Sequence, residues 1–297
     1  MSTDSNSGSG TPRQGLPRWM KRRVPKGGAN RFTADLLDQL HLETVCDHAR
    51  CPNRGECYAS RTATFLILGD RCTRDCRFCS VEPGRPRPVD VDEPRRVAEA
   101  VARMQLRHVV ITCVTRDDLP DGGAGHFCRC IEAIRGVTDA TVEVLPSDFA
   151  GNADAVRSLV AAAPDVYNHN CETVPRLFGE VRGPMPDYRR TLEIFRLIRE
   201  IAPSMRIKTG LMLGLGETAA ELLDTLAELY ASGCDMLTLG QYLRPSPRQL
   251  PVVRFYEPEE FDRLCEQAKA IGFKDVAAGP FVRSSYHAGE MLNPTDS

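Results

Sequence analysis

The sequence has no apolar run approaching the roughly 18 residues that a membrane-spanning helix needs. It also lacks an excess of charge of one sign, because 38 Lys and Arg residues nearly balance 40 Asp and Glu residues, for a net charge of -2. No global field therefore attracts nucleic acid or a membrane surface, and we expect neither as a partner. A signal peptide is not visible, and Met1–Gly10 is Ser/Gly-rich rather than Arg-rich. We therefore expect a cytoplasmic protein.

Cysteine, in contrast, is abundant, with twelve residues in a chain of 297. The chain is too long, and too regular in its helix and strand patterning, for a small disulfide scaffold. Six of the cysteines form two tight triplets, and no fourth cysteine stands at ligand spacing beside either one. Such clustering indicates metal ligation in a reducing compartment.

Apolar segments of strand length alternate with segments of helical period after Arg61. The expected strands are Ala63–Leu68, His108–Val114, Thr141–Leu145, Asp165–His169, Arg206–Leu213 and Met236–Leu243. This alternation predicts an α/β fold with a parallel sheet and right-handed crossovers. Six βα units, followed by the apolar segment Val276–Val282, are too few for a complete eight-unit barrel. We therefore predict a partial TIM-like barrel, with functional residues at the carboxyl ends of its strands.

The chain divides into four parts on these patterns. We expect a disordered, basic arm over residues 1–30, an N-terminal extension over 31–61, the barrel over 62–272, and a C-terminal segment over 273–297 that closes the barrel. Between Arg13 and Arg31 the arm contains seven Lys and Arg residues and no acid. It is either a solvated, flexible segment or a docking surface, and the sequence leaves both open.

The first informative motif is the 72–79 triplet, Cys72, Cys76 and Cys79, which follows the first expected strand with the spacing C-x3-C-x2-C. Thiolates select zinc, copper(I) or iron–sulfur clusters. A structural zinc site needs a fourth close ligand, and ferredoxin spacings supply four cysteines. Three thiolates on a four-iron cluster leave one iron open to an outside ligand, which is a catalytic feature. The alternative is a zinc or disulfide knot.

The 46–57 triplet lies upstream and consists of Cys46, Cys51 and Cys57, spaced C-x4-C-x5-C. It also has three thiolates. His48 is either a zinc ligand or a surface histidine. A second cluster here needs a ligand from elsewhere in the chain or an open iron.

The C-x3-C-x2-C spacing after the first strand of a βα barrel resembles the radical S-adenosylmethionine (SAM) superfamily. Together, the two triplets resemble the lipoyl synthase family of that superfamily, over about residues 19–288. The resemblance also includes RDDLPDGGA at 116–124, HNCETVP at 169–175, GLGET at 214–218, QYLRPS at 241–246 and RSSYHA at 283–288.

The resemblance implies two [4Fe-4S] clusters. SAM would chelate the open iron of the first, and its reductive cleavage would yield a 5′-deoxyadenosyl radical. The second would be an auxiliary cluster, consumed as the sulfur source, with Ser285 as its fourth ligand. Taken alone, Ser285 would more simply be a turn or cap residue, but the missing fourth ligand favours the metal role.

The resemblance further implies the substrate and the partners. Two sulfur atoms would enter at carbons 6 and 8 of an octanoyl-lysine on a carrier protein, either the glycine-cleavage H protein or the lipoyl domain of a 2-oxoacid dehydrogenase acyltransferase. An electron donor and a cluster-repair protein are further expected partners. Polar residues in strand-end loops are expected to contact SAM or substrate, or else to cap their own loops and form ion pairs: Asp117, Asp118, Asn170, Glu172 and Glu217.

Two other functions fit parts of the pattern. Another radical sulfur-inserting enzyme, such as a biotin synthase or a tRNA methylthiotransferase, would share the barrel. The former lacks an N-terminal second triplet, and the latter carries extra domains for which this chain has no room. A non-catalytic electron-transfer or structural metal protein would not need a long barrel with an open-iron triplet.

Overall fold

The computed structural model describes residues 15–21 and 29–292. Its main sheet has eight strands in the order β1-β2-β5-β6-β7-β8-β9-β10. The strands are β1 (Glu43–Thr44), β2 (Thr64–Ile67), β5 (His108–Cys113), β6 (Thr141–Leu145), β7 (Val166–Asn168), β8 (Arg206–Leu213), β9 (Met236–Gln241) and β10 (Asp275–Gly279). Two short strands, β3 (Arg71–Cys72) and β4 (Glu82–Pro83), pair with each other.

The strands from β2 to β10 all pair in parallel. β2 and β9 are buried along their whole length, as is typical of parallel strands covered on both faces. The six expected βα units are present, and the fold is the predicted partial TIM-like barrel. The apolar segment that we expected after the sixth unit contributes β10, a seventh parallel strand. The sheet stays open because β10 does not pair with β2.

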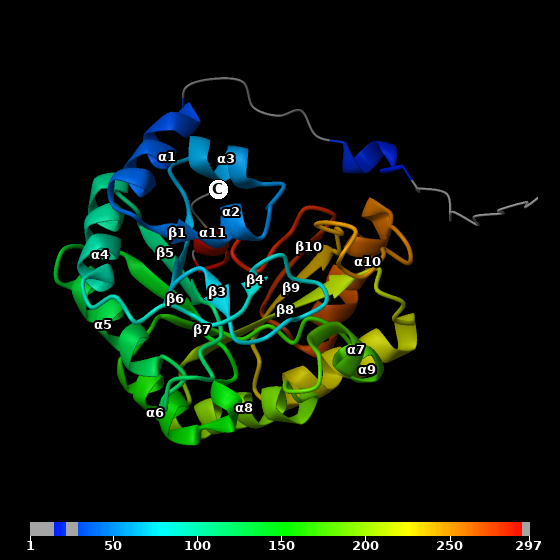
Figure 1. The fold of residues 1–297 in the computed structure, drawn as a ribbon. Helices are drawn as coiled ribbons and strands as arrows, with labels where there is room; N and C mark the ends of the chain where they lie inside the picture. Colours follow the sequence, from blue (N-terminus) through cyan, green and yellow to red (C-terminus); the bar gives the residue numbers. More distant parts are fainter. Residues whose placement is uncertain (1–14, 22–28, 293–297) are drawn as a thin grey trace, which may run out of the picture.

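Helices form a ring around the outside of the sheet (Figure 1). They are α4 (Glu93–Met104), α5 (Ala124–Arg135), α6 (Ala153–Ala161), α7 (Pro175–Arg182), α8 (Tyr188–Ile201), α9 (Ala219–Ala231) and α10 (Pro258–Ile271). Each turns an apolar stripe to the strands, as Val97, Val101 and Met104 of α4 do. The predicted capping box at the start of α9 is confirmed, since Thr218 and Glu221 satisfy each other's backbone N–H groups.

The N-terminal extension packs over the start of β2. It comprises α1 (Ala29–Gln39), β1, α2 (Val45–His48) and α3 (Arg54–Ala59), and β1 pairs antiparallel with β2. In the arm, the 3-10 helix η1 (Arg18–Met20) is anchored by Trp19, whose Nε1 donates to the Tyr256 carbonyl at 3.2 Å. The disorder expected for residues 1–12 and most of the basic arm's charges lie outside the described residues.

After β10 ends at Gly279, the C-terminal segment turns back toward the barrel. The Asn53 side chain donates to the Phe281 carbonyl at 2.7 Å, and the Thr64 hydroxyl donates to Ser285 Oγ at 2.8 Å. The chain thus crosses the gap between β10 and β2. The final helix, α11 (Ala288–Leu292), then contacts β5 and β10, and Leu292 packs with apolar side chains at the amino ends of β7 and β9. The described part of the segment therefore contacts both outer strands of the parallel part of the sheet, β2 and β10, and also β5.

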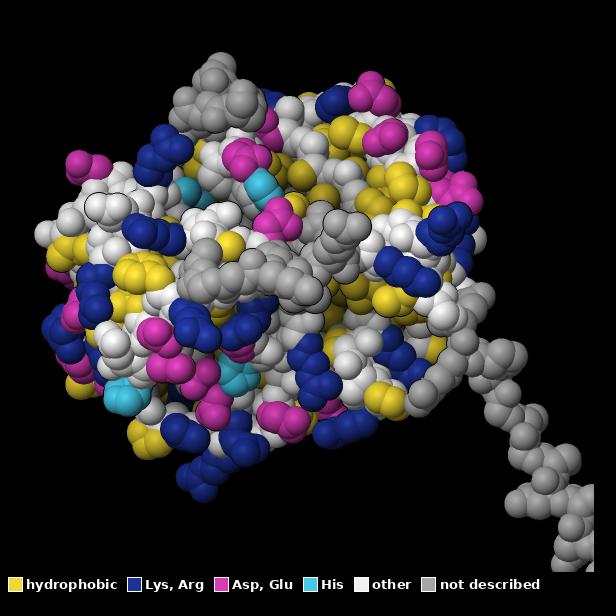
Figure 2. Space-filling model, turned by 90° about the horizontal axis from the view of Figure 1, so that it is seen from above, with side chains coloured by type: hydrophobic (Ala, Val, Ile, Leu, Met, Phe, Trp, Pro, Cys, Tyr) yellow, Lys and Arg dark blue, Asp and Glu magenta, His cyan; other side chains and the backbone are white. Residues whose placement is uncertain are grey.

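Basic and acidic side chains are interspersed over the face drawn in Figure 2, consistent with the balanced charge of the sequence. Within the described ranges, no helix is long and apolar enough to cross a membrane.

Candidate functional site

A cavity of about 470 Å³ opens at the carboxyl ends of the strands. It is lined by both cysteine triplets and by Ser284 and Ser285 of the C-terminal segment. The 46–57 and 72–79 triplets, which are separate in sequence, thus face one cavity. Ser285, from the far end of the chain, faces the same cavity. Apolar side chains complete the lining: Val45, Leu66, Val81, Val114, Leu145, Leu211, Met212 and Leu243.

The 72–79 triplet lies on the loop that leaves β2. The chain turns there through Leu68 and Gly69, whose φ angles are 70° and 100°. Backbone N–H groups point at two of the sulfurs: those of Arg74 and Thr115 lie 3.4 and 3.3 Å from Cys72 Sγ, and that of Val81 lies 3.4 Å from Cys79 Sγ. N–H donors of this kind stabilise a thiolate and tune an iron–sulfur cluster.

Burial has the opposite effect on three cysteines of the two triplets. It raises the pKa of Cys79 to about 12, the pKa of Cys57 to about 12 and the pKa of Cys46 to about 11. At these three positions burial therefore favours the neutral thiol. Iron supplies the positive charge that holds such sulfurs as thiolates, so the donor set fits a cluster and not a set of free reactive cysteines.

The 46–57 triplet is presented by the N-terminal extension, with Cys46 on α2, Cys57 on α3 and Cys51 between them. Ser285 lines the cavity with them, and its oxygen already accepts the Thr64 hydroxyl. The two triplet loops are also tied together, because the Ser80 hydroxyl donates to the His48 carbonyl. Nearby, the Gln249 side chain donates to the Cys79 carbonyl at 2.9 Å.

The disulfide form of the knot is not observed. All twelve cysteines are free, so the chain has no disulfide. Across the parts of the chain that the structure describes, no three His, Cys, Asp or Glu side chains are grouped as a site for a single metal ion. His48 instead binds Glu43 at the surface, with Nε2 and Oε2 2.8 Å apart.

Asn170 and Glu172, both expected near the cofactor, line the cavity. Burial raises the pKa of Glu172, against the opposing effect of the Arg182 guanidinium. Glu172 also has a φ angle of 72°, a costly conformation for a residue with a side chain and one that is common at functional sites. Arg182 donates to the Asn170 carbonyl at 2.7 Å, while its Nε and Asn170 Oδ1 are buried without a partner in the described chain. A carboxyl and a guanidinium in one cavity, with unused hydrogen-bonding atoms on Arg182 and Asn170, suit a zwitterionic ligand.

Asp118 and Glu217 are not brought into this cavity. Asp118 forms a two-pronged ion pair with Arg116, at 2.8 and 2.9 Å, and its side chain is 39% exposed. Glu217 accepts the N–H groups of Gly214 and Leu215 and the Tyr256 hydroxyl. For these two residues the capping and ion-pairing alternative describes the observed contacts, because each carboxylate is already committed to its own loop.

Among the cavity residues that sequence reasoning did not single out, Arg182 and Cys113 carry ionisable or ligand-type side chains. Arg182 ends α7, and no local motif distinguishes it. Cys113 is the last residue of β5, so the rule that function gathers at strand ends would have found it.

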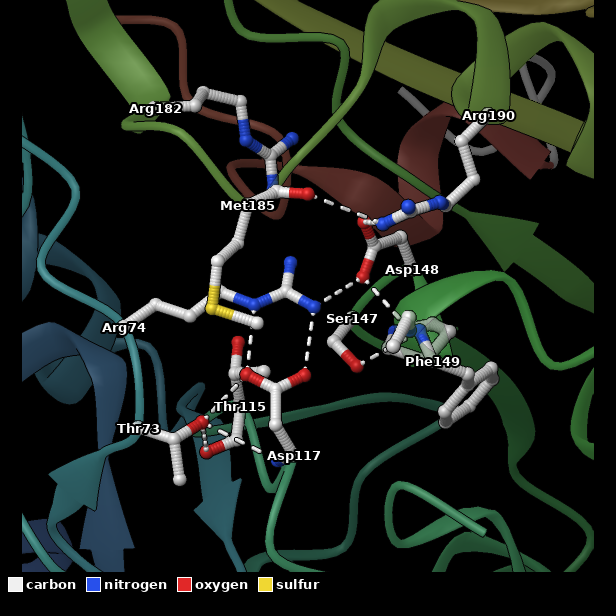
Figure 3. Close-up of polar contacts among 12 residues, drawn as sticks. Thr73, Arg74, Thr115, Asp117, Ser147, Asp148, Phe149, Arg182, Met185 and Arg190 are labelled. Carbon is white, nitrogen blue, oxygen red and sulfur yellow. Dashed lines mark hydrogen bonds and ion pairs between the residues drawn. The ribbon is translucent and has the colours of Figure 1, made fainter. Parts of the chain in front are cut away.

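Sequence reasoning also missed a buried ion cluster beside the 72–79 triplet. Arg74 lies between two carboxylates, those of Asp117 and Asp148, and Arg190 holds Asp148 from the other side (Figure 3). In sequence, these four residues stand in four separate segments.

The comparisons with known proteins agree with this geometry. Residues 66–229, more than half of the chain, match the model of the Radical SAM superfamily, which defines the class of the protein. Curated relatives narrow the class. The chain is 56% identical to the lipoyl synthase of Rhodopirellula baltica, over 93% of this chain and 88% of that protein. It is 53% identical to the lipoyl synthase of Caldanaerobacter subterraneus subsp. tengcongensis, over 93% of this chain and 97% of that protein.

The chain belongs to the lipoyl synthase family. It is thus a radical SAM enzyme that inserts sulfur, and it uses SAM and a [4Fe-4S] cluster. Solved structures support the fold. Methylornithine synthase (PylB) aligns with a TM-score of 0.53 and 12% identity, over 87% of this chain and 86% of that one. HydG, a maturase of the [FeFe]-hydrogenase, aligns with a TM-score of 0.54 and 16% identity, over 88% and 68%.

Proposed function

We propose that this lipoyl synthase carries two [4Fe-4S] clusters with separate roles. The SAM-binding cluster would be held by the 72–79 triplet, and the auxiliary cluster by the 46–57 triplet with Ser285 as its fourth ligand. The supporting observation is that both triplets and Ser285 line one cavity. When bound, the first cluster and SAM supply a radical that removes hydrogen from an unactivated carbon, and the second supplies the sulfur atoms.

The remaining lining suits the substrate and the cofactor. Apolar side chains such as Leu66, Met212 and Leu243 match an octanoyl chain, which offers no hydrogen-bonding group along its length. Glu172 and Arg182 would bind the amino and carboxylate groups of SAM, since each presents the opposite charge inside the cavity. We therefore propose an octanoyl-lysine of a carrier protein as the substrate, with sulfur inserted at carbons 6 and 8.

Ser285 has the chemistry that a sacrificial ligand needs. An alkoxide is a harder and weaker ligand for iron than a thiolate, so it releases more easily when a cluster is dismantled. In the described chain, Thr64 already donates to this oxygen at 2.8 Å. Such a donor stabilises negative charge on the oxygen, as an outer partner of a metal ligand commonly does.

The test is an anaerobic incubation with SAM, a reductant and an octanoyl-lysine peptide, with 5′-deoxyadenosine and added sulfur both measured by mass spectrometry. Cys51→Ala and Ser285→Ala should still form 5′-deoxyadenosine, because the 72–79 triplet is intact, but neither should form dithiolated product efficiently. Ser285→Cys should retain the auxiliary cluster and release sulfur more slowly.

The matched control is Ser284→Ala, which changes the neighbouring hydroxyl in the same cavity. Dithiolated product from Ser285→Ala at the parental rate would remove Ser285 from the ligand set, and Ser284 or His287 would be examined next. Failure of the parent itself to add sulfur would refute the proposed function as a whole.

The carrier is proposed to be the H protein of glycine cleavage or a lipoyl domain of a 2-oxoacid dehydrogenase acyltransferase, served by a separate electron donor. A cluster-repair protein would rebuild the consumed cluster. Incubation with each octanoylated carrier in turn, at equal concentration, distinguishes the two substrates by initial rate.

A further inference from the structure

The buried ion cluster at Arg74 joins the first cysteine loop to the barrel wall. Arg74 stands between Cys72 and Cys76, and its side chain is 3% exposed. Its Nε and Nη2 donate to the two oxygens of Asp117 at 2.9 and 2.7 Å, and Nη2 lies 2.6 Å from Asp148 Oδ1. One guanidinium therefore bonds to the loops that follow two different strands, β5 and β6.

Neighbouring contacts extend this connection in both directions. Thr73 donates its hydroxyl to Asp117 Oδ2 at 2.8 Å, and its N–H donates to the Thr115 carbonyl at 3.1 Å. The second oxygen of Asp148 accepts Arg190 Nη1 of α8 at 2.7 Å. Figure 3 shows the resulting chain of contacts, which runs from the cysteine loop through the ends of β5 and β6 to α8.

The energetics of this cluster favour a fixed geometry. Burial opposes the charge on Asp148, yet the hydrogen bonds and charge of Arg74, with help from Arg190, hold the pKa of that carboxyl far below its usual range. The ionised form of Asp148 is therefore favoured, and the two-pronged contact between Arg74 and Asp117 restricts both distance and orientation. The other contacts of the loop are weaker: Gln249 donates a single hydrogen bond to the Cys79 carbonyl at 2.9 Å, and the Arg77–Glu180 ion pair is more than half exposed.

We propose that Arg74 is a positioning residue, which fixes the cysteine loop in the geometry that presents three thiols to a cluster and leaves one iron open. This inference rests on the proposed function of the 72–79 triplet. Arg74 does not line the cavity, so it acts through the loop and not by contact with SAM or substrate.

The test uses the anaerobically reconstituted holoenzyme and the variant Arg74→Lys. Lysine keeps the charge but cannot bridge two carboxylates in this way. Three readouts are taken: iron and sulfide content, the change in the electron paramagnetic resonance (EPR) spectrum of the reduced cluster on SAM addition, and kcat and KM for 5′-deoxyadenosine formation. We expect reduced cluster content, a weakened SAM-induced spectral change and roughly a tenfold fall in kcat, the scale set by losing a charge-assisted hydrogen bond.

Asp117→Asn tests the same link with less risk to folding, because the amide retains the shape and one acceptor oxygen. It should shift each readout in the same direction by a smaller factor. The matched control is Arg199→Lys. Arg199 also bonds a carboxylate, that of Asp235, and several backbone carbonyls, but it does so where β8 and β9 begin, at the opposite end of the barrel. This control should leave the cluster readouts at parental values.

Parental values of all three readouts in Arg74→Lys would overturn the proposal. Equal losses in Arg199→Lys would overturn it as well, because they would mean that general destabilisation causes the effect. A parent enzyme with no SAM-responsive cluster would instead refute the proposed function, so the two failures are distinguishable.

Discussion

The most sharply quantifiable prediction concerns Glu143 and Lys208, an ion pair inside the barrel. Lys208 Nζ lies 3.1 and 3.0 Å from the two oxygens of Glu143, and both side chains are 0% exposed. Asn168 donates to Glu143 at 2.7 Å. Although burial opposes its ionisation, Lys208 and the other donors hold the pKa of Glu143 below the ordinary value.

Lys208→Met removes the lysine and leaves a buried carboxylate whose remaining neighbours are Asn168 and, at 3.6 Å, His108 Nε2. Breaking a buried pair in this way costs about 3–5 kcal/mol of unfolding free energy, a large part of the roughly 5–15 kcal/mol that a protein of this kind has. The double variant Glu143→Gln with Lys208→Met removes both charges and keeps an acceptor for Asn168, so it should cost about 1 kcal/mol or less.

The assay is urea unfolding of the metal-free, reduced chain, followed by circular dichroism. The midpoint should fall far more for Lys208→Met than for the double variant, with unchanged slope. The stability that ionised Glu143 contributes also depends on pH. A lowered folded pKa gives stability that is complete above the unfolded value of about 4.3 and is lost as pH falls through the folded pKa. The double variant should lack this part of the acid dependence. A loss of under about 1 kcal/mol in Lys208→Met would refute the reasoning.

Three further outcomes are expected. Cys76→Ala should form no 5′-deoxyadenosine under dithionite, and normal formation would contradict the assignment of the 72–79 triplet. Gly240→Ala would place a methyl group 2.1 Å from the Val282 carbonyl oxygen, so the segment that carries Ser285 must shift. Sulfur insertion should then fall while 5′-deoxyadenosine formation persists. The control is Gly179→Ala, whose added methyl group would have no neighbouring atom within 4 Å. If the Arg13–Arg31 arm docks an acidic carrier, it should raise the rate of association with that carrier by roughly 10–10³-fold at low salt. Turnover of the whole carrier should then fall steeply as salt is added. Equal salt dependence for a short peptide substrate would exclude this role of the arm.

Much of the barrel is determined locally by the sequence. The strands Thr141–Leu145 and Arg206–Leu213 begin and end at the expected residues, and Thr218 and Glu221 form the expected capping box. Strand runs, helical periods and caps depend on neighbours within a few residues, so a single sequence carries them. The cysteine spacing is local in the same sense, because the loop length between the cysteines is read directly from the sequence.

Other features depend on contacts between distant segments. Whether a strand-end acid faces the cavity is decided by the loop conformation: Glu172 lines the cavity, whereas Glu217 turns back to cap its own loop. Arg182, at the end of α7, lines the same cavity although it lies ten residues beyond Glu172. A sequence pattern does not show which distant segments will come into contact.

The sequence by itself therefore determined the class of fold, the two cysteine triplets and the family. Only the tertiary structure decided that both triplets and Ser285 share one cavity, and that Arg74 ties the cysteine loop to β5 and β6. The physical reason is the range of the interactions. Backbone hydrogen bonding and apolar periodicity act between residues near in sequence, whereas a shared cavity and a buried ion cluster form only when packing brings remote side chains to within a few ångströms of one another.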